Sequence, residues 1–340
     1  IPEVRTMSRP NQNDRAAGAL LGLFLGDALA MPVHWYYDRA ALQRDYGEVR
    51  SMLAPRNPHP DSILFRSSYV PRDPEADILH DQAVFWGRPG VHYHQNLQAG
   101  ENTLNLRLVQ LLLDTIEERR VYDPDLYLEQ MIAFLRNPHS HSDTYVEEWV
   151  REFFDRRAQG FKLRDCGVTE KHIGGLPGPV ALLVRFHGNP EFARLTAHEH
   201  RELTHKGPFM AEALDAVADI LLPVLAGEPL AETIDRVGRV SSNRLLTRDF
   251  KALAAKDDFE VIGRMLSPAC YVQDAVPATL YLARKYADRP EEGLVANTMA
   301  GGDNCYRGAV LGALLGAANG VNAWPESWLS DLRYRPLVTG

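Results

Sequence analysis

The sequence contains few cysteines and no excess of positive charge. Its 340 residues include 37 Lys and Arg against 45 Asp and Glu, which gives a formal net charge of -8. This balance argues against a general nucleic-acid-binding protein, because neutralising phosphates requires clustered basic residues. The three cysteines, Cys166, Cys270 and Cys305, are an odd number without CxxC spacing. They exclude a disulfide scaffold, argue against a zinc site built from cysteines, and indicate the reduced thiols of a cytoplasmic protein.

Long apolar runs are also scarce. The most apolar stretch, residues 18–33, falls about two residues short of the roughly 18 that a membrane-spanning helix needs, and it contains Asp27. The residues before it lack the basic segment of a signal peptide. We therefore expect neither a membrane span nor a targeting segment in this part of the chain.

Helical periodicity is the dominant pattern in the sequence. Apolar residues recur at three- and four-residue steps in residues 103–120 and 207–226. Weaker versions of the pattern cover residues 123–135, 144–158, 190–203, 230–240 and 273–286. Proline and glycine stand between these segments, where helices stop or start. Alternating strand-like runs are scarce, so the sequence predicts an all-α protein.

Residues 50–100 do not fit the helical pattern. They are rich in Pro, His and aromatic side chains and show neither the helical nor the strand period. A loop of this length inside a compact domain is usually functional or disordered. We interpret it as an ordered excursion over one face of the protein, and a mobile surface loop is the alternative. Its last residues, including His92 and His94, would then border a cleft.

Two segments carry glycine at every fourth position, which places the glycines along one side of a helix. The first stripe is Gly18, Gly22 and Gly26, and the second is Gly308, Gly312, Gly316 and Gly320. A glycine inside a helix costs up to about 1 kcal/mol relative to alanine, so these positions need a compensating gain. We expect the two helices to pack side by side, with their backbones in close approach at the centre of the fold.

Polar turns stand at the ends of these glycine stripes. Asp27 ends the first stripe, and Asp303 begins the second after a Gly-Gly pair. A third polar helix start, Glu101-Asn102, precedes a Leu-rich segment. Asp and Asn commonly cap helices, and helix N-termini attract anions. If the two striped helices pack together, these turns converge on one cleft with room for a cation or a sugar.

Together these motifs resemble the ADP-ribosylglycohydrolase superfamily, which includes ADP-ribosyl-arginine and ADP-ribosyl-serine hydrolases, dinitrogenase-reductase-activating glycohydrolase and the J-type crystallins. The first stripe, ending in Gly-Asp-Ala at 26–28, resembles the family's opening helix, and Leu-Thr-His at 203–205 resembles its Leu-Thr-His-Pro. Residues 297–320 resemble Asn-x-Gly-Gly-Asp-x-Asp-Thr followed by a glycine-striped helix. The resemblance implies a compact orthogonal all-α bundle, a single domain over residues 11–335 that includes the long loop 50–100, with a ligand cleft where the motifs meet.

Family members of known chemistry hold two magnesium ions with a Thr-Asp-Asp set and an Asp-x-Asp-Thr set. By resemblance, the corresponding residues of this chain are Gly100, Glu101 and Asn102 for the first set and Asp303, Cys305 and Tyr306 for the second. Two carboxylates remain where four are expected, and Mg²⁺ prefers hard oxygen ligands in octahedral geometry. We therefore expect no paired-magnesium site. One alternative keeps a single Mg²⁺ ion, held by Glu101, Asn102 and Asp303 with water.

The substituted motifs favour the hypothesis that Cys305 is a nucleophile. Cys305 lies in the first turn of a predicted helix beside Asp303, and a helix N-terminus lowers the pKa of a thiol. His34, which stands where the family has a glutamate, would accept the thiol proton, and Glu101 or Asp303 would orient it. The reaction would break a C–N bond of a small ligand, as in an N-glycoside, an amide or an amidine.

Further residues are predicted to contact this small-molecule substrate. They are Asp27, Asn102, Gly174, Gly175, His205, Asn304 and Tyr306. We expect no nucleic-acid or membrane partner, and either a monomer or a small homo-oligomer. The alternative to an enzyme is a catalytically inactive structural or ligand-binding protein, because the J-type crystallins show that this fold also serves as a structural protein.

Overall fold

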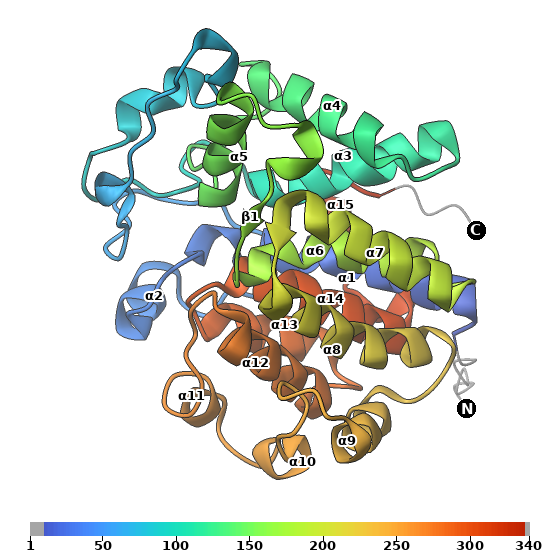
Figure 1. The fold of residues 1–340 in the computed structure, drawn as a ribbon. Coiled ribbons are helices and arrows are strands. Elements are labelled where there is room, and N and C mark those ends of the chain that lie inside the picture. Colours follow the sequence, from blue (N-terminus) through green and yellow to red (C-terminus); the bar gives the residue numbers. More distant parts are fainter. Residues whose placement is uncertain (1–9, 337–340) are drawn as a thin grey trace.

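Helices make up most of the computed structural model, which describes residues 10–336 (Figure 1). Within this range the chain forms fifteen α-helices, several short 3-10 helices and one two-stranded sheet. The prediction of an all-α protein is confirmed. The expected helices at 103–120, 207–226 and 230–240 correspond to α3, α8 and α9.

The elements follow one another along the chain in this order. The first half contains α1 Gln12–Ala30, η1 Met31–Val33, α2 Arg39–Tyr46, η2 Leu64–Arg66, η3 Pro74–Ala76, η4 His80–Phe85, α3 Leu104–Arg119, α4 Pro124–Arg136, α5 Glu148–Ala158, η5 Leu163–Asp165, β1 Val168–Thr169, η6 Ile173–Gly175 and α6 Pro177–Arg185. The second half contains α7 Pro190–Thr204, β2 His205–Lys206, α8 Pro208–Leu225, α9 Leu230–Val240, α10 Phe250–Leu253, α11 Asp258–Val261, α12 Val272–Lys285, α13 Pro290–Met299, α14 Asn304–Asn319, η7 Val321–Ala323 and α15 Glu326–Asp331.

The two glycine-striped helices, α1 and α14, lie side by side at the centre of the molecule (Figure 1). A Cβ atom added to Gly22 would lie 2.0 Å from the carbonyl oxygen of Gly312, and one added to Gly26 would lie 1.9 Å from that of Gly308. These distances are far inside van der Waals contact, so the helix backbones touch directly. The predicted close approach is confirmed. Because Gly18 faces Gly316, the helices run antiparallel, and the end of α1 meets the start of α14.

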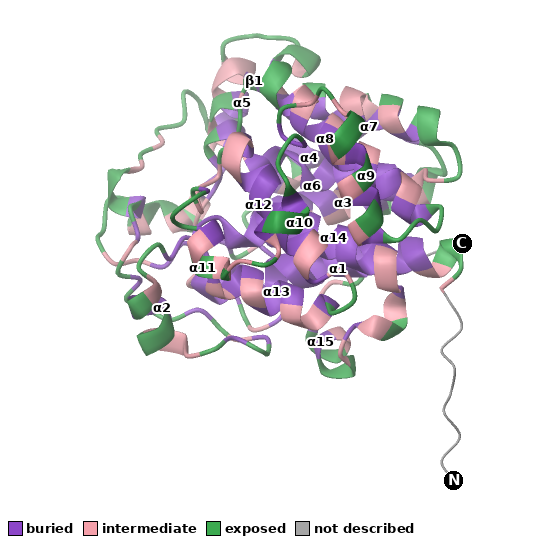
Figure 2. Ribbon diagram, turned by 90° about the horizontal axis from the view of Figure 1, so that it is seen from below, coloured by how far each residue is buried: buried purple, intermediate pink, exposed green. Residues whose placement is uncertain are grey.

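Helix α1 is buried over nearly its whole length (Figure 2). With η1 it forms a 22-residue segment, Gln12–Val33, that is long and apolar enough to cross a membrane by length and composition alone. This segment is longer than the apolar stretch 18–33, which was expected to be too short to span, and the structure corrects that length. The apolar window is 100% buried against other parts of the protein, which is the environment of a core helix.

The long loop between α2 and α3 is an ordered excursion, as interpreted from the sequence. It contains three 3-10 helices and sends His59, Leu64 and His92 into the interior, where each is fully buried. The loop also holds the segment before α5 in an extended form, because the Tyr145 N–H donates to the Tyr93 carbonyl oxygen at 3.0 Å. This pairing explains why α5 begins at Glu148, later than the predicted 144–158.

Adding a methyl group between α1 and α14 should destabilise the protein. In Gly312→Ala the new Cβ would lie 1.9 Å from the Gly22 carbonyl oxygen, so the two backbones must separate. We expect a loss of about 3 kcal/mol or more in the free energy of unfolding, measured by urea denaturation. Gly188→Ala is the matched control, since no atom lies within 4 Å of its added Cβ. Equal stability of the two variants would contradict the role of the glycine contact.

Candidate functional site

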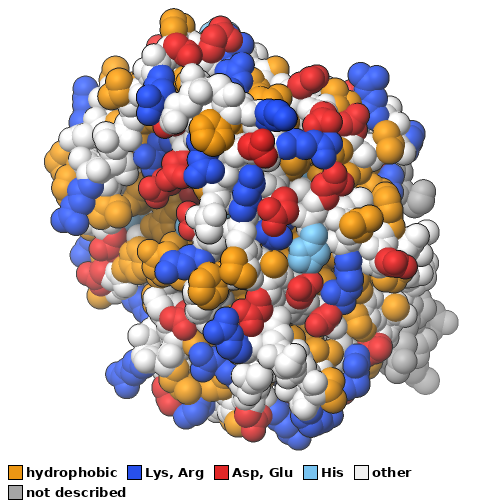
Figure 3. Space-filling model, viewed as in Figure 1, with side chains coloured by type: hydrophobic (Ala, Val, Ile, Leu, Met, Phe, Trp, Pro, Cys, Tyr) orange, Lys and Arg blue, Asp and Glu red, His pale blue; other side chains and the backbone are white. Residues whose placement is uncertain are grey.

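A pocket of about 470 Å³ opens on the face shown in Figure 3, where hydrophobic and acidic side chains surround a recess. The long loop and the segments around β1 and α5 contribute most of its walls. Its aromatic lining residues are Trp35, Tyr37, Tyr93, Tyr145, Trp149 and Tyr271. Its ionisable lining residues also include Asp61, Glu147, Glu148, Glu170, Lys171, His172, His205 and Cys270. We call this the aromatic pocket.

Short backbone pairings hold one side of the aromatic pocket together. Strands β1 and β2 pair in parallel, with Val168 opposite His205. The residues after β1 then pair with the segment before α12, because the Ile173 N–H donates to the Cys270 carbonyl oxygen at 2.8 Å. This pairing places His172 opposite Tyr271 and next to Cys270. Three segments far apart in sequence thus meet at the pocket.

A Gly-Gly turn positions Asp303 at the start of α14. Gly301 and Gly302 have φ angles of +69° and +65°, which glycine adopts without strain. A Cβ added to Gly302 would lie 2.0 Å from the Pro268 carbonyl oxygen, so the chain passes too close for any side chain. The Asp303 N–H donates to the same Pro268 oxygen at 2.9 Å. This hydrogen bond fixes the position of the Asp303 backbone, and with it the direction of the carboxyl group.

Asp303 is one end of a row of four buried side chains joined by hydrogen bonds. Its Oδ1 lies 2.9 Å from His34 Nε2, and His34 Nδ1 lies 2.8 Å from His94 Nε2. His94 Nδ1 lies 2.7 Å from Asp143 Oδ1, and Asp143 Oδ2 accepts the Leu104 N–H at 2.8 Å. The four side chains are at most 1% exposed. We call Asp143, His94, His34 and Asp303 the His–Asp row.

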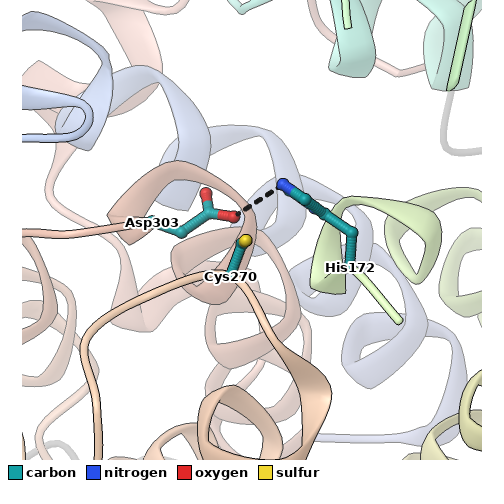
Figure 4. A group of neighbouring side chains, drawn as sticks. All are labelled: His172, Cys270 and Asp303. Carbon is teal, nitrogen blue, oxygen red and sulfur yellow. Dashed lines mark ion pairs between the residues drawn. The ribbon is translucent and has the colours of Figure 1, made fainter. Parts of the chain in front are cut away.

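The free end of the His–Asp row points toward the pocket. In Figure 4, Asp303, His172 and Cys270 extend toward one another from three different segments. Asp303 Oδ2 lies 3.6 Å from His172 Nε2, and within the described residues it has no hydrogen-bond partner. Because His172 and Cys270 line the aromatic pocket, the Asp303 carboxyl group lies directly behind the pocket wall.

Glu147 brings a second buried carboxyl group to the pocket. Glu147 lines the pocket although it is only 7% exposed. Its Oε1 atom accepts a hydrogen bond from the Tyr306 hydroxyl. Burial raises the pKa of Glu147 to about 8, and the Tyr306 hydrogen bond opposes this only in part. Burial also raises the pKa of Tyr306, so its hydroxyl remains a donor. At neutral pH Glu147 therefore carries a proton.

Backbone strain occurs where the pocket meets the His–Asp row. Trp35 has a φ angle of +61°, an unfavourable conformation for a bulky residue. Its indole stacks on the His34 ring with centroids 3.7 Å apart and meets Tyr93 and Tyr145 edge-on. Such strain clusters at functional sites. Here the strained backbone lets Trp35 line the pocket while its neighbour His34 takes part in the His–Asp row.

The hypothesis of a reactive Cys305 thiol rests on a lowered thiol pKa, and that premise is wrong. Cys305 is fully buried, and its Sγ lies 3.5 Å from the backbone carbonyl oxygen of Asp27, to which the thiol donates. Burial, reinforced by the nearby Asp27 carboxylate, raises the pKa of Cys305 well above that of a free thiol. The helix N-terminus was expected to lower this pKa, but loss of water outweighs it.

The predicted polar turns do converge, and they hold the backbone together. Asp27 accepts hydrogen bonds from the Asn102 amide at 3.0 Å and from the Thr103 N–H and hydroxyl at 2.9 and 2.8 Å. Burial raises the pKa of Asp27 to about 6. Asn304 donates to the carbonyl oxygens of Val33 and Thr298, so its amide is also structural. These side chains do not line the aromatic pocket.

The structure places some of the other predicted site residues at the pocket and others away from it. His205 lines the pocket, and a Cβ on Gly175 would lie 2.5 Å from its ring, so this glycine makes room for the histidine. The Gly174 N–H donates to His172 Nδ1 at 2.9 Å. Glu101 is displaced from the predicted site: its Oε2 accepts the Gln98 N–H within its own loop at 2.6 Å.

The side chains present do not fit a paired-magnesium centre. At the first family motif, the Asn102 Nδ2 group donates to Asp27 and to the Phe24 carbonyl oxygen, so Asn102 offers one neutral amide oxygen where the family motif has a carboxylate. At the second motif, Cys305 and Tyr306 donate to Asp27 and Glu147. The single-ion alternative stays a prediction: Glu101 Oε2 accepts the Gln98 N–H within its own loop, whereas Asn102 Oδ1 and Asp303 Oδ2 have no hydrogen-bond partner within the described residues.

One group of three potential ligands occurs within residues 10–336. The ligand atoms of His172, Cys270 and Asp303 lie within 4.8 Å of one another. However, His172 Nδ1 accepts the Gly174 N–H, so the proton of a neutral ring must lie on Nε2. The nitrogen that faces Asp303 and Cys270 is then a donor without a lone pair for a metal. In this tautomer the arrangement fits a close polar contact between His172 and Asp303 rather than a metal site.

Several residues of the pocket carry no recognisable signal in the sequence. Glu147, and Asp143 of the His–Asp row behind the pocket, stand in an irregular stretch before α5, and Cys270 belongs to no motif. His172 precedes the Gly174-Gly175 pair, which was the one clue to a tight turn there. These residues become a site through contacts between distant segments, which local spacing does not reveal.

Thiol labelling should distinguish the three cysteines. Cys270 is partly exposed in the pocket, whereas Cys166 and Cys305 are buried. We expect iodoacetamide to modify one thiol in the folded protein, and none in Cys270→Ser. Burial raises the pKa of Cys270, so the rate should still be rising at pH 9. Peptide mass spectrometry identifies the modified residue, and rapid labelling of native Cys305 would contradict this assignment.

The protein should lose stability as the pH falls below about 6.5. Burial lowers the pKa of His200 and His205 to about 3, and that of His59 and His141 to about 4. Each histidine binds a proton more readily when the protein is unfolded. Each therefore lowers the free energy of unfolding by up to about 1.4 kcal/mol per pH unit between about pH 6.5 and its pKa in the folded protein. The raised pKa values of Glu147 and Asp27 act in the opposite direction, but these two groups are outnumbered by the histidines.

Thermal unfolding between pH 7 and 4.5 measures this effect. The midpoint should fall with pH, and His200→Gln should make the fall less steep. A midpoint that is constant over this range would contradict neutral burial of the histidines.

Comparisons with other proteins agree with this architecture. The ADP-ribosylglycohydrolase family model matches residues 8–339. An uncharacterized protein of Archaeoglobus fulgidus is 26% identical over 334 residues, covering 96% of this chain and 93% of that protein. A solved structure described as an ADP-ribosylglycohydrolase-related protein complex superposes with a TM-score of 0.64 at 21% identity, covering 96% of this chain and 94% of that chain; this likeness shows the fold alone. Since the family model spans nearly the whole sequence, the chain belongs to the ADP-ribosylglycohydrolase family of hydrolases.

Proposed function

We propose that this protein hydrolyses the N-glycosidic C–N bond of a small ligand in the aromatic pocket, with Glu147 as the general acid. The observation that carries the proposal is a buried, protonated carboxyl group in the wall of an aromatic pocket. Family membership supports the reaction class, because the ADP-ribosylglycohydrolases are hydrolases of glycosidic bonds. The bond and the acid are inferred from the chemistry of the pocket residues.

The state of Glu147 suits protonation of a leaving nitrogen. With the Tyr306 hydroxyl donating to Oε1, the acid proton of Glu147 belongs on Oε2. A pKa of about 8 keeps this proton in place at neutral pH, yet it is close enough to neutrality for ready transfer. A carboxyl group kept neutral by an apolar pocket is an established pattern for general acids that act on glycosides.

The pocket walls suit a ribosyl compound with an attached ring or chain. Ligand pockets of about 300–1,000 Å³ hold small molecules, and this one is about 470 Å³. Tyr37 and Tyr271 provide exposed aromatic faces for stacking. The acidic side chains of Asp61, Glu148 and Glu170 surround the pocket with negative charge, which stabilises the positive charge that develops on a sugar as its C–N bond breaks.

The proposed reaction conserves atoms and protons within the pocket. The Glu147 Oε2–H bond breaks as an N–H bond forms on the leaving nitrogen, and the electron pair of the C–N bond leaves with that nitrogen. A water molecule then bonds to the sugar carbon and passes its proton to the Glu147 carboxylate, which restores the acid. Cys305 and Glu101 have no part in this scheme, since neither reaches the pocket.

Replacing the acid proton donor should abolish most of the turnover. The substrates are ADP-ribosyl-arginine, an ADP-ribosylated peptide and nicotinamide riboside, with the released sugar measured by chromatography. We expect wild-type protein to hydrolyse at least one, and Glu147→Gln to reduce its kcat by about 10²- to 10⁴-fold. In the wild type, kcat/KM should fall above about pH 8, because the acid form of Glu147 is lost there.

Glu152→Gln is the matched control, because Glu152 lies five residues further along the chain, at an exposed position of α5. It should retain wild-type kcat, and thermal unfolding should show that Glu147→Gln is folded. Full activity of Glu147→Gln would refute its role as the acid. Binding of all three compounds without hydrolysis would instead favour the structural or ligand-binding alternative.

A further inference from the structure

We infer that the His–Asp row is a proton chain that holds one mobile proton and sets the charge of Asp303 behind the aromatic pocket. The use of this charge in catalysis rests on the proposed function, but the proton arrangement itself does not. The row spans Asp143, His94, His34 and Asp303, through contacts of 2.7, 2.8 and 2.9 Å. Each distance is that of a direct hydrogen bond.

Asp143 determines where the first proton lies. Its carboxylate accepts the Leu104 N–H on Oδ2 and faces His94 Nδ1 with Oδ1. A carboxylate offers no hydrogen, so His94 must donate from Nδ1. In a neutral His94 ring, Nε2 is then an acceptor, and His34 must donate to it from Nδ1.

The remaining proton lies between His34 and Asp303. If neutral His34 is protonated on Nδ1, its Nε2 holds a lone pair toward Asp303 Oδ1. A nitrogen lone pair and an oxygen lone pair 2.9 Å apart would repel each other, so the Asp303 carboxyl group must carry a hydrogen. With Asp143 ionised and both rings neutral, these hydrogen bonds assign a neutral Asp303 to the resting protein. Burial supports this assignment, since it raises the pKa of Asp303 and lowers that of His34.

A second arrangement has the same number of protons. The Asp303 Oδ1–H bond breaks as His34 Nε2–H forms, and the His34 Nδ1–H bond breaks as His94 Nε2–H forms. Asp303 is then ionised, His34 is again neutral, and His94 is a cation beside the Asp143 carboxylate. The row has a net charge of -1 before and after this shift, and no proton leaves for solvent.

The charge in the pocket selects between the two arrangements. The resting arrangement has one buried charge and the shifted one has three, so burial favours the resting form of an empty pocket. A positive charge in the pocket lies near Asp303, whose free Oδ2 faces the pocket-lining His172 and Cys270. It therefore favours an ionised Asp303. We conclude that the row supplies a negative charge when a cationic ligand or transition state forms.

Nitrogen-15 NMR of the histidine side chains tests the resting arrangement without any substrate. His34→Gln and His94→Gln identify the two signals among the 12 histidines, and His80→Gln, outside the row, is the control. We expect both rings to be neutral with the proton on Nδ1. In Asp303→Asn the new amide donates to His34 Nε2, so both tautomers should persist. A neutral ring of His34 or His94 with its proton on Nε2 would overturn the proton chain.

A cationic probe tests the shift. With protonated 1,4-dideoxy-1,4-imino-D-ribitol bound, His94 of the wild type should become protonated on both nitrogens. Asp303→Asn should bind the probe without this change, because the amide cannot give up its proton. A bound probe that leaves wild-type His94 neutral would overturn the shift. Probe binding with no hydrolysis of any N-riboside would count against the proposed function and leave the proton chain intact.

Discussion

Direct contact between the backbones of α1 and α14 is the constraint on which the rest of the structure depends. Glycine at matching positions lets carbonyl oxygens of one helix approach the Cα atoms of the other, where a methyl group would find no space. Because the helices are antiparallel, the chain that leaves α1 meets the chain that enters α14. His34 and Asp303, separated by more than 260 positions, become hydrogen-bonded neighbours as a consequence.

Buried ionisable groups make up much of the site, and most of them are stabilised by hydrogen bonds. An unpaired buried charge is costly, and this protein compensates each carboxyl group in a different way. Asp27 accepts three hydrogen bonds from Asn102 and Thr103, Asp143 pairs with His94, and Glu147 remains protonated. Amide, hydroxyl and imidazole groups thus stabilise the buried carboxyl groups of this protein.

The sequence is sufficient to predict the fold but only part of the site. Helical periodicity and glycine spacing are local patterns, so they predict the helices and the packing of α1 on α14. The same reasoning places Asp303 and His34 together. It is wrong for Cys305, because a rule about helix ends ignores burial, which has the larger effect on the thiol. Glu147, His172 and Cys270 are missed because only long-range contacts bring them to one pocket. No pattern within a single helix encodes those contacts.

The long loop has a consequence for how this protein can diverge. It contributes the wall of the pocket that includes Asp61, Ile63 and Tyr93, whereas Asp303 is anchored to the rigid helix pair. Insertions and deletions are tolerated in loops far better than in packed helices. Changes in the part of the loop that lines the pocket therefore reshape its wall while Asp303 keeps its place on the helix pair, whereas His94, which lies in the same loop, is tied to His34 by a hydrogen bond and has less freedom to change.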